Sequence, residues 1–373
     1  MTDDGQAGGL GVDTQTLDDD PPSLAVDPDR LKAPAVTIII PTLNRPGYAA
    51  DTARQVLQQS FRNFELLVVD QSDHPAADDL RNRLALLNDA RVRYMHVPVR
   101  GVANARNEGV AQRRGDIVLF LDDDVILLGR DFIDSHLRAL ADPQVGGVTG
   151  RVVERLNRPN SRRTVARISI GGRTLDNMSG TEPVPVHGLK GGNMSLKAEL
   201  FDRIGGFDRN FGGTGLLEEA DFSTRVRAAG WKLMFQPEAE LFHFSAPAGG
   251  NRVESDLHRE WWRFRATAYY TRKHRGRLGL LPFLTTFTLI ALRCAWRERA
   301  PSALAYLATG IKAGLLAHRN GPDERLPRLP EAVARQPSTS PTCCESRRSP
   351  APGRHGATCA RSAGSRHPRR GRR

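Results

Sequence analysis

The sequence predicts an α/β fold built on a doubly wound, mostly parallel sheet. Short apolar runs alternate in the first half of the chain with helical segments of about a dozen residues, and short loops join them. One run, Ile117–Leu121, is apolar throughout and ends in three carboxylates. A run of this kind is typical of a strand buried on both faces of a parallel sheet. These observations indicate one large α/β domain with appended segments.

The first strand is predicted over 36–40, where β-branched residues dominate and Pro41 ends the run. The loop over 42–47 contains neither Gly-x-Gly-x-x-Gly nor a Walker lysine, which argues against a dinucleotide-binding or P-loop enzyme. The elements predicted between this loop and the acidic strand are helices over 48–59, 76–87 and 102–114 and strands over 65–69 and 92–97.

Beyond the acidic strand the pattern is less regular. The polar, Arg-rich stretch 155–181 is interpreted as a flexible acceptor loop. A short helix over 198–204 should end at Gly205, because glycine readily takes the left-handed conformation that stops a helix. The other predicted elements are helices over 131–141 and 217–230 and strands over 145–153, 232–235 and 240–244.

Composition divides the chain into four parts. The acidic residues 1–33 and the Arg-, Pro- and Ser-rich tail 331–373 lack hydrophobic periodicity, and both are predicted to be disordered. Between them we expect an α/β domain over 34–250 and a helical extension over 251–330. The part of the tail from 336 onward has no Leu, Ile, Val or Phe, a composition that a frameshift in a GC-rich gene would also produce.

The formal net charge is +12 at pH 7. The acidic N-terminal part and the basic tail nearly cancel, so the body itself carries about +11. Such a body favours phosphate-bearing ligands or an anionic membrane surface. Three of the four cysteines lie in the tail, so no disulfide framework is implied. The N-terminal residues lack the apolar stretch of a secretory signal, and we expect a cytoplasmic protein.

Asp122, Asp123 and Asp124 follow the apolar strand, at the place where open α/β sheets bind ligands. Adjacent carboxylates repel one another, and a divalent cation carrying phosphate oxygens relieves the repulsion. In an extended backbone Asp122 and Asp124 point to one side and Asp123 to the other. We therefore expect Asp122 and Asp124 to act together, with a solvated acidic turn as the alternative. Asp70 is a further acid at the end of a predicted strand.

Two helices carry polar side chains toward the same edge of the sheet. Arg106 and Asn107 fall on the first two turns of the helix before the acidic strand, close enough to contact a phosphate or to order the carboxylates. An exposed helix face is the alternative. In the later helix Glu218 and Asp221 share one face, whereas Glu219 projects about 100° away from Glu218.

Together these motifs resemble an inverting family-2 glycosyltransferase of the GT-A fold, of bacterial type, over about residues 35–247. The resemblance implies a sheet with a Rossmann-like nucleotide-binding half and an acceptor half, followed by a C-terminal helical extension. The motifs that carry it, in the family's order, are Val36-Thr-Ile-Ile-Ile-Pro-Thr-Leu-Asn-Arg45, Val68-Val-Asp-Gln-Ser72, Ala105-Arg-Asn-Glu-Gly109, Leu121-Asp-Asp-Asp124, Gly192-Asn-Met-Ser195, Ile204-Gly-Gly-Phe-Asp208 and Glu218-Glu219.

The resemblance implies a site for a nucleotide-diphospho sugar, with a UDP-type donor favoured. By this resemblance Asp70 would hydrogen-bond the base, and Asp122 would touch the ribose or the water shell of the metal. Asp124 would bind Mn²⁺ or Mg²⁺ that bridges the diphosphate. His243 would complete the metal or diphosphate site, with a packed core histidine as the alternative. The other donor-site residues implied are Pro41, Thr42, Asn44 and Arg45 around base and ribose, together with Arg106, Asn107 and Asp123.

Inversion needs one base that takes the proton of the acceptor hydroxyl as this hydroxyl attacks the anomeric carbon. A metal lowers the barrier by neutralising the charge that develops on the leaving diphosphate. The family usually has an Asp as the base, in a Glu-Asp pair, whereas this chain has Glu218-Glu219. The residue that matches the base is therefore Glu219, with Glu218 and Asp221 as alternatives.

The C-terminal third has basic and apolar segments. A basic cluster over 272–277 precedes an apolar run over 278–292, and a second run covers 303–317. Both runs are shorter than the roughly 20 residues of a spanning helix, so they suit interfacial or packing helices. We expect peripheral association with the inner face of the plasma membrane, where a polyprenyl-linked acceptor would lie. Trp261 and Trp262 are interpreted as the packing face of an amphipathic helix rather than as a platform for an acceptor sugar.

The leading interpretation is metal-dependent sugar transfer to a glycan or lipid-linked acceptor in cell-envelope polysaccharide synthesis. A sugar nucleotidyltransferase of the same fold is one alternative, disfavoured because no Gly-rich loop bearing Arg or Lys follows the first strand. Another is a basic protein that binds nucleic acid or an anionic membrane and has a degenerate site. Nucleic acid is not expected as a partner, because the tail lacks aromatic residues for base stacking.

Overall fold

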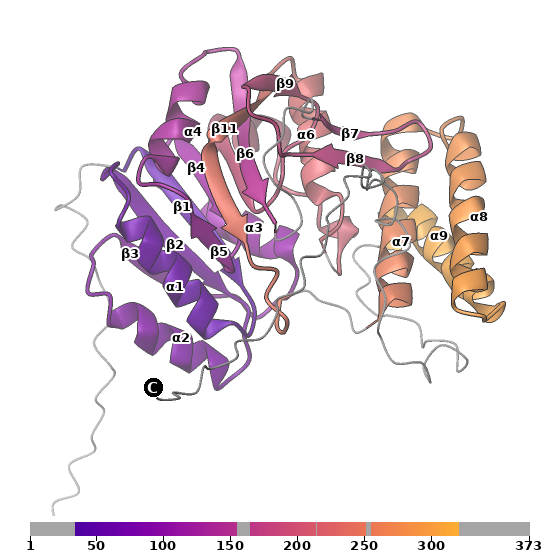
Figure 1. Cartoon of the computed structure of the whole chain (residues 1–373), viewed down its shortest axis with the longest axis horizontal. Helices are drawn as coiled ribbons and strands as arrows, with labels where there is room; N and C mark the ends of the chain where they lie inside the picture. Colours follow the sequence, from indigo (N-terminus) through magenta and orange to yellow (C-terminus); the bar gives the residue numbers. More distant parts are fainter. Residues whose placement is uncertain (1–33, 155–164, 214, 251–254, 321–373) are drawn as a thin grey trace, which may run out of the picture.

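The computed structural model describes residues 34–154, 165–213, 215–250 and 255–320. These residues form a mixed sheet in the order β3-β2-β1-β4-β10-β6-β11-β5, with β9 paired to β11, and helices lie on both faces (Figure 1). The predicted doubly wound α/β fold is confirmed. The parallel half has β1 at its centre and consists of β1 (Val36–Thr42), β2 (Phe64–Asp70), β3 (Val92–His96) and β4 (Ile117–Leu121).

Both faces of the parallel half are buried, which explains its continuous apolar runs. Ile38 and Ile40 contact one core and Ile39 the opposite core, because side chains alternate along a strand. The helices that contribute to the core with Ile38 are α1 (Pro46–Leu57), α2 (Ala76–Ala85) and α4 (Phe132–Leu140). Those that contribute to the core with Ile39 are α3 (Val102–Ala111), α5 (Glu199–Ile204) and α6 (Glu218–Ala228).

Antiparallel pairing begins next to β4. There β10 lies between β4 and β6, antiparallel to both, and β11 runs parallel to β6 but antiparallel to β5 and β9. The sequence pattern predicted two strands in place of β11; the structure has one, whose register against β6 shifts between Gln236 and Glu240. The strands of this half are β5 (Val125–Leu127), β6 (Val145–Val153), β9 (Val184–Val186), β10 (Asn193–Lys197) and β11 (Lys232–His243).

The predicted acceptor loop lies only partly within the described residues, since 155–164 fall outside them. The described part contains a hairpin of β7 (Val165–Ile168) and β8 (Thr174–Asn177). Arg275 of α7 donates to the carbonyl oxygens of Ile168, Ser169 and Ile170 at 2.7 to 3.1 Å. The hairpin is therefore attached to the C-terminal helices.

The C-terminal helices α7 (Asp256–Arg275), α8 (Leu280–Arg297) and α9 (Ser302–Asn320) share a core of their own beside the sheet (Figure 1). Trp261 and Trp262 are only 3% and 2% exposed in that core, which confirms their interpretation as packing residues. Among the described helices, α8 alone has the length and apolar composition needed to cross a membrane, although both apolar runs were predicted to be too short. The helix reaches this length because it continues to Arg297, beyond the predicted end of the apolar run at 292.

Candidate active site

A cavity of about 330 Å³ lies where β1 and β4 end and where β11 ends beside them. Its lining combines acids, basic side chains and glycines. Most of the residues singled out in the sequence meet here, although they come from segments far apart in the chain. The lining consists of Pro41, Thr42, Leu43, Arg45, Gln71, Val102, Arg106, Asp122, Asp123, Asp124, Lys190, Gly191, Gly192, Gly215, Glu218, Glu219, His243 and Gly250.

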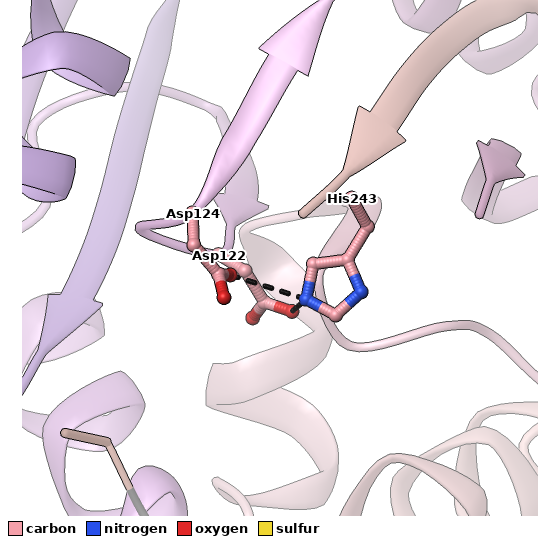
Figure 2. Close-up of side chains that lie close together, drawn as sticks. All are labelled: Asp122, Asp124 and His243. Atoms are coloured by element: carbon pink, nitrogen blue, oxygen red, sulfur yellow. Dashed lines mark ion pairs between the residues drawn. The ribbon is translucent and has the colours of Figure 1, made fainter. Parts of the chain in front are cut away.

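Asp122, Asp124 and His243 form a compact group in this cavity (Figure 2). One potential ligand atom from each lies within 4.8 Å of the other two. His243 Nε2 is 3.1 Å from Asp124 Oδ1 and 3.9 Å from Asp122 Oδ2. The register of β11 against β5 places His243 opposite Val125, and so next to Asp124. The expected alternation holds, because Asp122 and Asp124 join this group and Asp123 does not.

Asp124 and His243 shift each other's pKa. Burial favours the neutral forms, but it is outweighed by the hydrogen bond between Asp124 and His243. This contact raises the pKa of His243 to about 10, with help from Glu154 and Asp122, and it lowers the pKa of Asp124 to about 2. An imidazolium therefore faces a carboxylate at neutral pH, and His243 must lose this proton before its ring nitrogen can bind a metal.

Arg45 reaches the acids from the loop after β1. Its Nη1 lies 2.9 Å from Asp123 Oδ1 and 3.3 Å from Asp124 Oδ2, while Nε and Nη2 donate to the carbonyl oxygens of Ala248 and Gly249. Gly249 has φ +73°, and a Cβ there would come within 2.6 Å of the Arg45 side chain. This glycine therefore lets the loop after β11 close over the guanidinium. The resemblance implied a position of Arg45 near base and ribose. In the structure its side chain donates hydrogen bonds to Asp123 and Asp124.

Asp123 points away from the metal group and ties two strand ends together. It accepts a hydrogen bond of 2.7 Å from Thr42 Oγ1 at the end of β1. Burial raises the pKa of Asp123 to about 6, although Arg45 and Thr42 counteract the shift. Its geometry is that of a positioning residue for the loop that carries Asp122 and Asp124.

The paired glycines before β10 permit close approach. A Cβ on Gly192 would lie 2.1 Å from Asp122 Oδ2, and one on Gly191 would lie 2.5 Å from an Arg106 Nη atom. Any larger residue would displace these side chains. The sequence pattern predicted close backbone approach to a ligand at this point, and the structure shows close approach to the side chains of the site.

Glu218 and Glu219 begin α6 and line the cavity. Glu218 is 2% exposed and pairs with the buried Arg106, whose Nη1 lies 2.7 Å from Glu218 Oε1. Burial and the neighbouring Glu219 raise the pKa of Glu218, and Arg106 counteracts them. The Oε2 atoms of both glutamates are buried and have no hydrogen-bond partner among the described residues. The two carboxylates differ in that Glu218 pairs with Arg106, whereas Glu219 is in no described ion pair.

Asp221, the third base candidate, is fully buried and does not line the cavity. It contacts Arg225 at 2.9 Å, His274 at 2.7 Å and Lys273 at 2.6 Å. Although burial opposes the shift, these partners lower the pKa of Asp221. Two of the partners belong to α7, so Asp221 joins α6 to the C-terminal helices.

Three other predicted site residues lie outside the lining. Asp70 is fully buried and accepts hydrogen bonds from the Tyr94 hydroxyl and the Ser72 amide. The Asn44 side chain exchanges hydrogen bonds with Asp73. Asn107 is bound at both ends by the backbone of Phe207 and so fastens the segment before η2 (Arg209–Phe211), away from the acids.

Two polar lining residues were missed by the sequence analysis. Lys190 Nζ lies 2.6 Å from Asp176 on β8, and that carboxylate raises the pKa of Lys190. Its signal was a single lysine in the glycine-rich segment before β10. Gln71, directly after Asp70, donates to the carbonyl oxygen of Val99. Its signal was its place in the segment that the resemblance assigns to the base.

Comparison with known proteins gives a family and several relatives. The family described as Glycosyl transferase family 2 matches residues 37–205. The uncharacterised protein y4gI of Sinorhizobium fredii is 29% identical over 267 residues, 64% of this chain and 27% of that protein. The O-antigen chain rhamnosyltransferase RfbN of Salmonella typhimurium is 23% identical over 56% of this chain and 66% of its own length. The chain thus spans 27% of the first of these relatives.

Among solved structures, a structure of GalNAc-T7 with UDP, GalNAc and Mn²⁺ has a TM-score of 0.50 at 13% sequence identity. The match covers 78% of this chain and 58% of that chain. At this identity the likeness concerns the fold alone, and it agrees with the GT-A architecture that the sequence motifs implied.

Proposed function

Because the chain belongs to glycosyl transferase family 2, an inverting class of enzyme, we propose that it moves a sugar from a nucleotide-diphospho sugar to a glycan or lipid-linked acceptor in polysaccharide synthesis. One observation carries the proposal. The group of Asp122, Asp124 and His243 lines the same cavity as Glu219, so a cation site and a candidate base share one space. A cytoplasmic location is part of the proposal, since the composition implies no disulfide framework.

Asp122, Asp124 and His243 would hold the Mn²⁺ or Mg²⁺ ion. The fit rests on their ligand atoms, which lie within 4.8 Å of one another, and on the preference of hard cations for carboxylate oxygens. When bound, the ion neutralises the charge that develops on the leaving diphosphate. Arg45, Arg106 and Lys190 also line the cavity, where each pairs with a carboxylate, so the ion would supply the added positive charge that an anionic donor needs.

Glu219 is proposed as the base. Its carboxylate accepts the proton of the acceptor hydroxyl, the hydroxyl oxygen bonds to the anomeric carbon, and the bond from that carbon to the diphosphate breaks. Arg106 holds Glu218 beside it, and α7 holds Asp221 away from the cavity. Of the three candidates, Glu219 is therefore the one that is both in the cavity and outside a described ion pair.

The donor nucleotide is proposed to be of the UDP type and to lie along Pro41, Thr42 and Gln71, which line the cavity on the side of β1 and β2. Nucleotide binding to the folded protein raises its midpoint of thermal unfolding by mass action. The test is this midpoint for the full chain with UDP, dTDP, GDP or CDP, each with and without Mn²⁺.

We expect a rise with UDP that requires Mn²⁺ and is absent in Asp124→Asn. Asp116→Asn is the matched control, since Asp116 is exposed at the opposite end of β4 and should retain the rise. A wild-type chain that responds to none of the four nucleotides with Mn²⁺ would contradict the proposal. A response to another nucleotide alone would replace UDP and leave the metal assignment intact.

A further inference from the structure

Helix α8 carries large apolar side chains on the side turned away from the protein. Leu281, Leu289, Leu292 and Trp296 are 74%, 64%, 51% and 82% exposed. At about 100° per residue these four positions fall within about 80° of the helix circumference. We call them the outer α8 face. A contiguous apolar surface of this kind is uncommon unless a partner covers it.

The opposite side of α8 already has a partner within the protein. Phe283, Phe287 and Cys294 are at most 1% exposed in the core shared with α7 and α9. In Figure 1 α8 lies at the edge of the molecule, far from the parallel strands. The residues of the outer α8 face therefore lie outside the hydrophobic core and are free to contact an external partner.

Basic residues predominate around α8. Between Arg272 and Arg297 the sequence has six Arg or Lys residues and no Asp or Glu. Lys273 and Arg297 pair with acids of the protein, and the remaining excess of positive charge attracts anions. Arg277 is exposed before α8 begins, and Arg299 is exposed just after it ends. The partner should therefore be both apolar and anionic.

We propose that the outer α8 face docks on the surface of a membrane that contains anionic lipids. The helix axis lies along the membrane plane, the leucines and Trp296 enter the boundary between headgroups and acyl chains, and Arg277 and Arg299 contact lipid phosphates. Thr285 lies between these side chains, and its hydroxyl donates to the Leu281 carbonyl oxygen, so burying it leaves no unpaired donor.

Two other arrangements fit the structure less well. From Leu281 to Trp296 the face extends about 22 Å, which is shorter than the hydrocarbon core of about 30 Å that a spanning helix crosses. Spanning would also break the packing of Phe283 and Phe287. A second copy of the chain would bring one positively charged surface against another, without acids on α8 to compensate.

The inference does not depend on the proposed sugar transfer, since its test measures lipid binding alone. The full chain is mixed with vesicles of phosphatidylcholine or of phosphatidylcholine with about 30% phosphatidylglycerol. Sedimentation gives the bound fraction. Tryptophan fluorescence reports the environment of Trp296 once the signal of the other three tryptophans is subtracted, of which Trp261 and Trp262 are buried and Trp231 is partly buried outside α8. Trp296→Phe supplies the background signal.

The test variant is Leu289→Glu with Leu292→Glu. The matched control is Leu86→Glu with Val99→Glu, which adds the same charge at two exposed apolar positions, 84% and 59% exposed, outside α8. We expect the wild type and the control to bind the anionic vesicles with a blue shift of Trp296. The α8 variant should bind at least about tenfold more weakly, because two apolar side chains are replaced by carboxylates.

Binding of the α8 variant equal to that of the control would overturn the proposal. The proposal would also be overturned if the wild type binds vesicles without a shift of Trp296 fluorescence and loses this binding at about 0.5 M salt. That result would assign the binding to the nine arginines of 336–373. A wild-type dimer in vesicle-free solution that the α8 variant dissociates would identify a second copy as the partner instead.

Discussion

Arg106 of α3 and Glu218 of α6 form a buried ion pair in which Nη1 lies 2.7 Å from Oε1. The two residues are 112 positions apart in the sequence and are 3% and 2% exposed. Their contact distinguishes two adjacent glutamates that both line the cavity. Glu218 is paired with a cation, and Glu219 is in no described ion pair.

Replacing Glu219 with Gln should lower kcat by about 100-fold or more, because an amide cannot take the acceptor proton. Binding of UDP with Mn²⁺ should be unchanged, since the metal group is untouched. Glu218→Gln is the neighbouring control and should retain more turnover. Nucleotide release from a panel of UDP-sugars and calorimetry with UDP measure the two effects. Equal losses of turnover in the two variants would reject the assignment of the base to Glu219.

Replacing Arg106 with Met should lower the free energy of unfolding by about 3–5 kcal/mol, because Glu218 would keep a buried carboxylate without its cation. Adding Glu218→Gln should recover part of this loss, since the remaining side chain is neutral. Urea denaturation of the two single variants and the double variant gives the coupling between the residues. A double variant whose loss equals the sum of the single losses would show that the ion pair has no energetic role.

Replacing Gly192 with Ala should weaken Mn²⁺ binding and leave the fold intact. The new Cβ would lie 2.1 Å from Asp122 Oδ2, so the carboxylate must move out of the metal group. Gly47→Ala is the control, because a Cβ there meets nothing within 4 Å. Calorimetric titration with Mn²⁺ compares the two variants. Equal affinities would mean that Asp122 does not act as a ligand.

Stability should fall in mild acid because of His136. Burial lowers the pKa of His136 from 6.5 to about 4, and its ring contacts Ser195 and Asn193 at 2.9 Å. The unfolded chain therefore binds this proton more readily than the folded one. The stabilisation is complete above pH 6.5 and is lost as the pH falls toward 4. We expect a loss of about 2 kcal/mol between about pH 7 and pH 5.

Urea denaturation at several pH values in that window measures this loss. His136→Gln should remove most of the pH dependence, because glutamine can hydrogen-bond to Ser195 or Asn193 without titrating. A variant with the same slope of stability against pH as the wild type would show that other groups cause it.

Local patterns in the sequence determined the elements and the directions of neighbouring side chains. The apolar runs correspond to the buried strands, and the alternation after β4 puts Asp122 and Asp124 in one group and turns Asp123 toward Thr42. These features depend only on the geometry of an extended chain, in which side chains point alternately to either side. The domain limits proposed from composition remain predictions.

Contacts between distant segments were decided by the tertiary structure. His243 reaches Asp124 because β11 pairs with β5, and Asp221 is taken from the cavity by Lys273 and His274 of α7. Helical periodicity placed Asp221 on the same face as Glu218 but could not show that α7 would cover it. Periodicity defines the faces of each element, whereas the pairing of those faces depends on how the whole chain packs.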